Sequence, residues 1–383
     1  MSITKSFIPL FVALLASTAM ADELHLYDGR HIDQAVVKSE SFSKVEYRRK
    51  SVTQKVDSKE IRSIVYGRTS PEYKAGLAAL AEGNSMAAAQ NFIAAAEDEG
   101  LPDGIRASAY IECGESLLAN NNFAESLEIF TELLSTYPET RHYARALLGK
   151  GRAQFFTRQL GDAAATFSEL QNDVKTKDLG EVWGLEAEFA LLWAKEAQGE
   201  AGVLDGYRAL RARAREDFPA VANQCSLRMG RVYLGNDEVG QALPLFDEII
   251  ESRLTTDSSI VAGAYNGRGR ALFWEGRNEL KEASEAEGRK DLEAATAHLE
   301  DALAAFRAAR LDFLRVQTMF RGVAREQPES LYWAAQSFLN VASLADDLGL
   351  EEEDAERMGR ILLKRCAERF PQSDWGSRAA EEI

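Results

Sequence analysis

Histidine and cysteine, the residues that most often build metal centres and nucleophilic sites, are scarce in this sequence. There are four histidines and three cysteines in 383 residues, and no HExxH or CxxC spacing joins them. The GxSxG, GK[ST] and GxGxxG motifs of hydrolases and nucleotide-binding folds are also missing. We therefore predict a non-catalytic protein, not an enzyme, that uses no metal and no cofactor.

The few cysteines argue against a disulfide framework. Cys113, Cys225 and Cys366 are far apart, each among apolar neighbours in a segment that we expect to be helical. An odd number in an exported protein is compatible with one disulfide and one free thiol. Free cysteine also behaves as a small buried hydrophobe, and that is the interpretation that we favour.

The sequence lacks the run of about 18 to 20 apolar residues that a transmembrane helix needs. Its apolar N-terminal segment, residues 7–16, follows Lys5 and precedes the small residues around Ala21. A short apolar segment between a positive charge and such a cleavage motif is typical of a secretory signal peptide. We expect residues 1–21 to be removed at about Ala21, leaving a protein that is exported, soluble, periplasmic or in the cell envelope, and not membrane-spanning.

Positive charge is in short supply. The formal net charge is −16, and it is unevenly distributed. Residues 22–68 carry ten Lys or Arg against eight Asp or Glu, whereas residues 69–383 carry 34 against 53. An acidic surface repels phosphate backbones and anionic lipid headgroups. We therefore expect no nucleic acid partner.

What the sequence does contain is a glycine followed sixteen positions later by a phenylalanine, repeated along most of its length. The first steps between pairs are 38 and 37 residues, a period typical of stacked helical hairpins. In such a stack the glycine lets two helices cross closely, and the phenylalanine fills the groove between one hairpin and the next. The pairs are Gly76 and Phe92, Gly114 and Phe130, Gly151 and Phe167, and Gly230 and Phe246.

Residues 107–138 form the clearest unit. Gly114 lies in a first predicted helix, three asparagines at 120–122 make a turn, and Phe130 lies in a second helix that stops at Pro138. This order of residues resembles the tetratricopeptide repeat. The resemblance implies a mainly α fold, a right-handed superhelical solenoid of six or seven hairpins over residues 69–383.

Other parts of the chain fit the resemblance less closely. Residues 181–219 fill one degenerate unit, and residues 329–371 form a last, capping pair. Gly269 begins a unit whose second helix is displaced, with Phe306 at the expected spacing after an insertion. The segments 137–140 and 370–373 also resemble the periplasmic tetratricopeptide subgroup of outer-membrane assembly lipoproteins and Tol-Pal coordinating factors.

Residues 22–68 have the alternating pattern of short β-strands rather than helices. Five strands in this length, with an Asp-Gly turn after the first, resemble the SH3-like and Sm-like small β-barrels. The basic cluster Arg48, Arg49 and Lys50 falls near the tip of the central hairpin. It would either bind an anionic glycan or lipid headgroup, or form a solvated turn that blocks edge-to-edge pairing, which we favour.

The resemblance also implies a groove lined by the first helix of each hairpin. The residue after the repeat glycine points into such a groove, and it is arginine in three units. Arginine binds carboxylates with a planar fork of donors, which suits an acidic peptide or helix as a protein partner. The other interpretation, which we favour, is that each arginine pairs with an acid of a neighbouring helix and that the aromatics pack between repeats. Glu115 also interrupts the arginine series. The candidate groove residues are Arg145, Arg152, Arg231 and Arg270, with Phe155, Phe156, Phe273 and Trp274 as apolar anchors.

A long-helix insertion is expected around residues 278–325. Apolar residues recur there at alternating steps of three and four from Leu292 to Phe320, which is a heptad seam. The seam at 292–320 would either join two copies of the chain as a homo-oligomer or pack against neighbouring helices of the array. We favour packing within the chain.

These patterns predict a protein–protein interaction scaffold or adaptor that binds partners in its concave groove. The alternative is an exported module that binds a solute, glycan or lipid. A scaffold should have a continuous open groove, whereas a ligand carrier should have an enclosed pocket lined by aromatic side chains.

Overall fold

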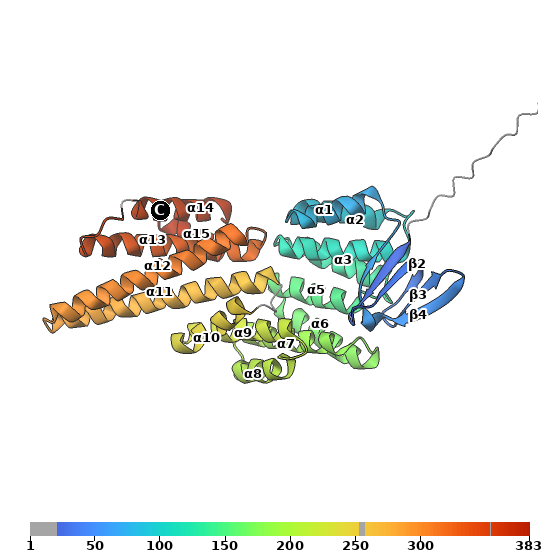
Figure 1. The fold of residues 1–383 in the computed structure, drawn as a ribbon, viewed down its shortest axis with the longest axis horizontal. Helices are drawn as coiled ribbons and strands as arrows, with labels where there is room; N and C mark the ends of the chain where they lie inside the picture. Colours follow the sequence, from blue (N-terminus) through green and yellow to red (C-terminus); the bar gives the residue numbers. More distant parts are fainter. Residues whose placement is uncertain (1–20, 253–256, 353) are drawn as a thin grey trace, which may run out of the picture.

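The computed structural model describes residues 21–252, 257–352 and 354–383. A small antiparallel sheet comes first and lies at one end of the molecule, and helices follow to the C terminus (Figure 1). This confirms the predicted mainly α solenoid behind a small β domain. The predicted signal peptide lies outside the described residues except for Ala21. Within the described residues, no helix is long and apolar enough to cross a membrane.

The sheet has the strand order β4-β3-β2-β1-β5, so β4 and β5 are its two ends. Its core contains Leu24, Ala35, Val45 and Ile64, all buried on one face. A 3-10 turn at Ser58–Glu60 leads into the last strand. The resemblance of this domain to SH3-like barrels stays a prediction. The strands are β1 (Asp22–Leu26), β2 (His31–Glu40), β3 (Lys44–Arg49), β4 (Val52–Asp57) and β5 (Ile61–Val65).

Fourteen helices of the described residues pair into seven hairpins, and α15 ends the array. The first three hairpins are α1 (Pro71–Ala81) with α2 (Ser85–Glu97), α3 (Asp103–Ala119) with α4 (Phe123–Thr136), and α5 (Tyr143–Phe156) with α6 (Leu160–Thr176). Next come α7 (Glu181–Ala197) with α8 (Val203–Ala214), and α9 (Pro219–Gly235) with α10 (Val239–Glu251). The last are α11 (Ser258–Gly288) with α12 (Leu292–Met319), α13 (Gln327–Asp347) with α14 (Ala355–Arg369), and then α15 (Asp374–Glu381).

The repeated glycine and phenylalanine meet as expected. A Cβ atom placed on Gly114 would lie 2.7 Å from the Phe130 ring, and one on Gly149 of the next hairpin 2.4 Å from it. The ring is fully buried between the two hairpins. The unit that begins at Gly269 differs from the prediction, because its close ring is Phe313, at 2.8 Å, and not Phe306.

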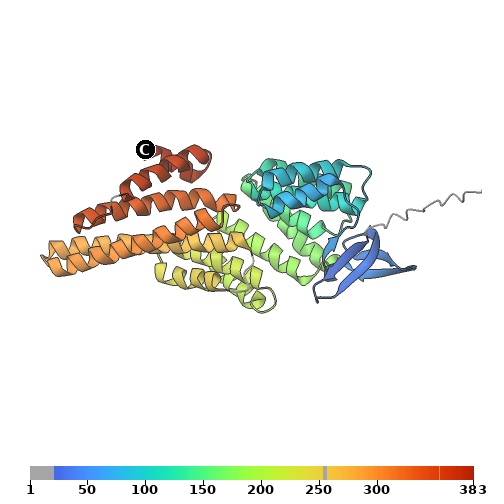
Figure 2. The same cartoon turned by 45° about the horizontal axis from the view of Figure 1, so that its top comes forward.

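The long insertion is a hairpin of two long helices, and not one extended helix over residues 278–325. Residues 278–288 continue α11, and the chain turns at Lys290, whose φ is 60°. Asp291 then caps α12 by accepting a hydrogen bond from the backbone N–H of Ala294 at 3.1 Å. Figure 2 shows this yellow-to-orange hairpin projecting from the array. The long helix α12 ends at Met319, six residues before the predicted end.

The heptad seam of α12 packs within the chain. Phe306, Phe313 and Val316 are fully buried among residues of α11 and α13. Of the seam residues, Leu292 at the tip of the hairpin is the one whose side chain is widely exposed. Because the seam is covered within the chain, the structure confirms the packing that we favoured for residues 292–320 and does not support a homo-oligomer interface there.

The three cysteines are all free and buried. Burial raises the pKa of the Cys113 and Cys225 thiols to about 12. The interpretation of these residues as small buried hydrophobes is therefore confirmed, and none of them is a reactive thiolate.

Candidate functional site

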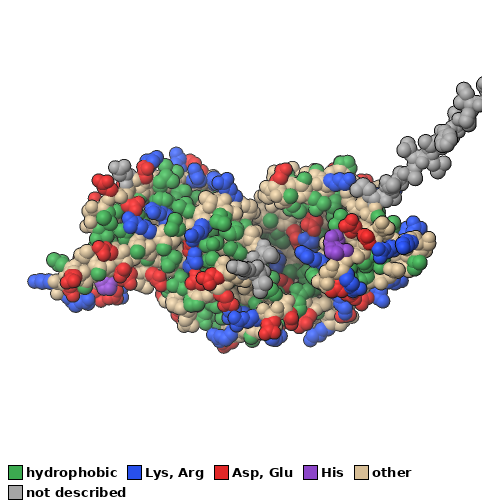
Figure 3. Space-filling model, in the orientation of Figure 1, with side chains coloured by type: hydrophobic (Ala, Val, Ile, Leu, Met, Phe, Trp, Pro, Cys, Tyr) green, Lys and Arg blue, Asp and Glu red, His purple; other side chains and the backbone are tan. Residues whose placement is uncertain are grey.

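A cavity of about 660 Å³ lies on the concave side of the array, where Figure 3 shows a hollow in the molecular surface. We call it the concave cavity. Its walls come from the first helices of four successive hairpins, α3, α5, α7 and α9, and from the start of α11. Residues 322–326, which connect α12 to α13, form another wall. The first helices of successive hairpins thus present side chains from equivalent repeat positions to one surface.

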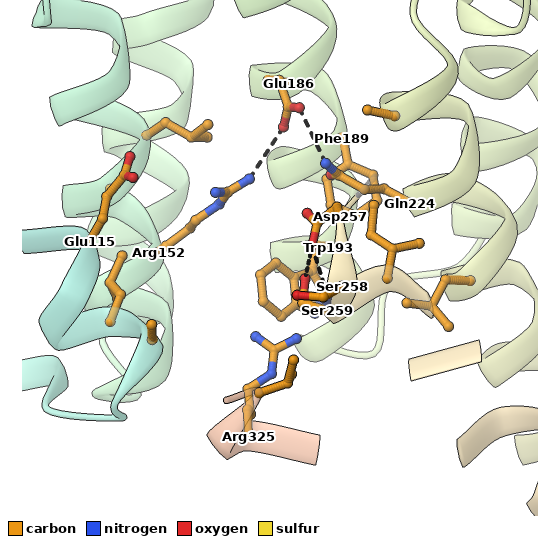
Figure 4. A pocket seen from close by; sticks show the side chains of 18 of the residues that line it. Glu115, Arg152, Glu186, Phe189, Trp193, Gln224, Asp257, Ser258, Ser259 and Arg325 are labelled. Atoms are coloured by element: carbon orange, nitrogen blue, oxygen red, sulfur yellow. Dashed lines mark hydrogen bonds and ion pairs between the residues drawn. The ribbon is translucent and has the colours of Figure 1, made fainter. Parts of the chain in front are cut away.

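Three of the predicted groove arginines line this cavity and are held by carboxylates. Arg145 donates to Glu112 at 2.8 Å and also to Glu115, so Glu115 is its partner rather than an interruption of the series. Arg152 contacts Glu186 at 3.3 Å (Figure 4). The structure thus shows the intramolecular pairing that we favoured from the sequence.

The third, Arg231, contacts Glu326 of the α12–α13 connection at 2.9 Å. Burial alone would lower the pKa of Arg231, but the carboxylate of Glu326 raises it above its ordinary value. The Asn266 side-chain amide also donates to Glu326, at 2.9 Å. This buried network fixes the connection to α9 and α11.

Arg325 enters the cavity from the same connection. Its guanidinium carbon lies 4.9 Å from the centre of the Phe156 ring and 5.7 Å from that of Trp193. The rings of Phe156 and Trp193 meet edge to face, with their centres 5.4 Å apart. Figure 4 shows Arg325 reaching toward Trp193, with Arg152 approaching from another helix. An arginine stacked on aromatic rings can bind an anion with its N–H edge.

The other predicted aromatic residue of this region, Phe155, supports the wall from behind. Its ring lies 4.1 Å from that of Trp193, and it packs against the core of α5, α6 and α7. Trp183 and Phe189 complete the apolar lining. Both lie in residues 181–219, which the sequence predicted only as one degenerate unit, so neither was predicted as a site residue.

Arg270, Phe273 and Trp274 are not part of the concave cavity. Arg270 contacts Glu329 at 3.3 Å, and Phe273 packs on Trp333 with ring centres 4.9 Å apart. Phe273 belongs to the C-terminal core of α11–α14, and the Trp274 ring lies beside that core, 6.5 Å from the Trp333 ring between centres. The connection at 322–326 enters the groove between the two groups, which is why the eight predicted residues do not form one surface.

We did not predict the connection at residues 322–326 from the sequence, because the long-helix insertion was expected to extend to residue 325. A backbone break near Gly322 and Pro328 was the available signal. A Cβ atom on Gly322 would lie 3.9 Å from the backbone oxygen of Gly83, in the α1–α2 turn. The connection, which contacts α9 and α11 through Glu326, therefore also lies close to the first hairpin.

The basic cluster lies at the turn between β3 and β4, away from the concave cavity. Arg49 contacts Asp33 at 2.6 Å, and Lys50 has a φ of 56° in the turn itself. Arg48 is exposed.

No group of three or more His, Cys, Asp or Glu in the described part of the chain could hold a metal ion. The cavity offers charged donors beside ring faces, which is an arrangement for binding.

Comparison with protein families identifies the repeat. The tetratricopeptide repeat family model matches residues 73–138 and 111–174. Residues 73–174 are therefore similar to tetratricopeptide repeats. The matched residues span α1 to α6, and the later hairpins continue the tetratricopeptide-like solenoid, with the longest helices in α11 and α12. A comparison with curated proteins found no match.

A comparison with solved structures found similar chains at low sequence identity. One is a tetratricopeptide repeat protein from Parabacteroides merdae, with 10% identity and a TM-score of 0.32 over 72% of this chain and 97% of that one. Another is the apo form of the quorum sensor NprR from B. thuringiensis, with 10% identity and a TM-score of 0.36; the match covers 81% of this chain and 96% of that one. A third is a tetratricopeptide repeat protein from Bacteroides fragilis, with 14% identity and a TM-score of 0.22; the match covers 77% of this chain and 98% of that one.

Proposed function

We propose that this chain is an exported, non-catalytic scaffold that binds a protein partner in the concave cavity. The observation that carries the proposal is the position of the cavity. It lies on the surface shared by the first helices of successive tetratricopeptide-like hairpins, and extended concave surfaces of this kind are what repeat proteins use for recognition. Export to the periplasm or cell envelope rests on the sequence of residues 1–21 alone.

The size and lining of the cavity suit a short segment of a partner. A volume of about 660 Å³ is within the range of ligand pockets, roughly 300–1,000 Å³. It holds a few side chains and not a folded domain. Phe156 and Trp193 provide the kind of aromatic anchor that dominates protein interfaces.

A second candidate function is the binding of a solute, glycan or lipid. The observation in its favour is that residues 322–326 close part of the groove, so that the cavity is bounded on several sides and lined by aromatic rings. This is the geometry that we associated with a ligand carrier rather than with an open scaffold.

In-cell crosslinking separates the two functions. Ala119 is exposed and lines the cavity, so Ala119→Trp fills the cavity without touching an ion pair. Ala297, exposed on the projecting hairpin, gives the matched control Ala297→Trp. We expect a tagged chain to crosslink to a reproducible protein partner, and Ala119→Trp but not Ala297→Trp to lose it.

Two results would overturn the scaffold. One is the absence of a protein partner, and the other is a partner that both tryptophan variants retain. A glycan, lipid or small molecule that co-purifies with the chain and is lost in Ala119→Trp would establish the second function instead.

A further inference from the structure

Arg325 is the one arginine of the concave cavity whose guanidinium has no carboxylate at hydrogen-bonding distance among the described residues. Its nearest, on Glu326, is 3.9 Å away and already accepts from Arg231 and Asn266. Outside the described part, residues 1–20 and 253–256 contain no Asp or Glu. Glu353 is the one acid there, and it follows Glu352, which pairs with Arg307 of α12.

The other charged groups of the cavity are engaged with one another. Three of the remaining arginines have the partners described above, and Arg228 donates to Glu196 at 3.0 Å. Among the lining carboxylates, Asp257 accepts from the backbone N–H of Ser259 at 2.8 Å and from its hydroxyl at 2.7 Å, which caps α11. Arg325 is therefore the lining arginine whose charge has no carboxylate at hydrogen-bonding distance among the described residues. A guanidinium has five N–H groups with which it can bind an anion.

The surroundings of Arg325 show that it faces the cavity. Burial lowers its pKa, and Arg231, Arg228 and Arg152 lower it further, although Glu326 opposes them. Its side chain nevertheless keeps 44% of its surface accessible. A cation that is surrounded by protein and still accessible borders an internal space that a ligand can enter.

Two aromatic rings, Phe156 and Trp193, lie within cation–π distance of the Arg325 guanidinium. A guanidinium that contacts aromatic rings in this way can still donate through its N–H groups. The planar N–H edge matches the two oxygens of a carboxylate, and the remaining apolar walls, Leu148, Trp183 and Phe189, lie in the same cavity.

We propose that Arg325 anchors the carboxylate of an acidic residue in the partner segment, and that an adjacent aromatic or aliphatic side chain of the segment fills the apolar part of the cavity. This inference rests on the proposed scaffold function and names the chemistry of its partner. The anchor lies on the α12–α13 connection, and not on the arginines that follow the repeat glycines.

A random peptide library displayed against the purified full chain tests this specificity. We expect the wild type to enrich peptides with Asp or Glu next to an aromatic or aliphatic residue. Arg325→Gln should lose the enrichment, and Arg325→Lys should keep part of it because the charge remains. The matched control is Arg360→Gln, which removes an exposed arginine paired only with Glu356. Selection without acidic enrichment, or the same enrichment on Arg325→Gln, would refute the anchor.

The enriched peptide then gives a quantitative test. Its acidic residue is replaced by the matching amide, and both forms are titrated by calorimetry. For the wild type we expect the acid to bind about tenfold or more tighter than the amide, as for a hydrogen bond between charged groups. For Arg325→Gln the two should bind alike. Because Arg325 has no carboxylate partner at hydrogen-bonding distance among the described residues, Arg325→Gln should lower the thermal midpoint only by the loss of its contacts with Phe156 and Trp193.

The failure of this inference is distinguishable from the failure of the scaffold function. If the in-cell partner is captured, is lost in Ala119→Trp and is retained by Arg325→Gln, the scaffold stands and the anchor is wrong. If no protein partner is captured at all, the scaffold function itself fails.

Discussion

In the repeat hairpins, a glycine of the first helix leaves space for the buried phenylalanine ring of the second helix. The rings of Phe92, Phe130, Phe167 and Phe246 are all fully buried. Each lies so close to a glycine that an added Cβ atom would overlap it. Because protein interiors are close-packed and such rings cannot move aside, the glycine is a steric requirement of the stack.

We expect Gly151→Ala to destabilise the array by about 1–3 kcal/mol, the usual cost of overpacking a core. A Cβ atom there would lie 2.3 Å from the Phe167 ring. Gly161, in the first turn of α6, has nothing within 4 Å of its Cβ position. Gly161→Ala is therefore the control, and it should leave stability equal or raise it by up to about 1 kcal/mol. Urea denaturation followed by circular dichroism measures both, and equal losses in the two variants would contradict the steric argument.

At the scale of elements, the β-sheet is locked to the helical array by a buried polar cluster. Glu40 at the end of β2 accepts from Arg141 at 2.6 Å and from the Tyr66 hydroxyl at 2.7 Å. The Tyr66 hydroxyl also lies 3.1 Å from Ser108 of α3. Glu40 is 4% exposed. A buried pair of this kind is stable only in one geometry, so the sheet and the first hairpins form one body.

His142 belongs to this interface and makes it sensitive to acid. Its Nε2 lies 2.9 Å from the Ser108 hydroxyl oxygen. Burial, and then Arg141 and Arg145, hold the pKa of His142 well below its ordinary value. In the unfolded chain a histidine titrates near about 6.5. Below that pH the unfolded chain takes up a proton that the folded chain does not, so the free energy of unfolding falls as the pH falls.

The loss should reach at most about 1.4 kcal/mol per pH unit from this one group. Urea denaturation between about pH 7 and pH 5 measures it. His142→Gln keeps a polar side chain beside Ser108 but cannot titrate, and it should show a shallower pH dependence than the wild type. Identical slopes in the two proteins would show that His142 is not protonated on unfolding in this range.

Local patterns in the sequence were enough to predict most elements. The spacing of Gly114, Phe130 and Pro138 predicts one hairpin, because the repeat concentrates its packing contacts within a unit. The length of α11 was not predictable in this way, since residues 278–288 are charged and carry no periodic apolar face strong enough to assign them to a particular helix.

The candidate site was less accessible to sequence reasoning. Its decisive contacts join residues that are distant in the chain: Arg231 and Glu326 are 95 positions apart. The sequence shows that arginines recur at one phase, but it does not show which carboxylates the superhelix brings to them. Arg325 lies outside the repeat phase altogether, so only the folded chain places it beside Phe156.

At the scale of the whole molecule, charge is divided between the outside and the cavity. The chain carries a net charge of −16, while the concave cavity is lined by five arginines against four carboxylates, and Arg325 is the arginine left without a carboxylate partner among the described residues. The outer surface therefore repels acidic segments, and the cavity supplies charge-assisted donors for them. Such a division restricts the binding of an acidic partner to one place on the molecule.

The same net charge should make the fold more stable in moderate salt. Like charges on a compact chain repel one another, and salt screens exposed charges over about 10 Å at 0.1 M. The buried arginine–glutamate pairs are screened much less. We expect the thermal midpoint, measured by circular dichroism at fixed pH, to rise between about 0.01 M and 0.15 M sodium chloride. Replacing the exposed Glu97 and Glu99 by Gln should raise the midpoint at low salt and reduce this response. A midpoint that falls with salt would mean instead that attraction between surface ion pairs outweighs the repulsion of the excess negative charge.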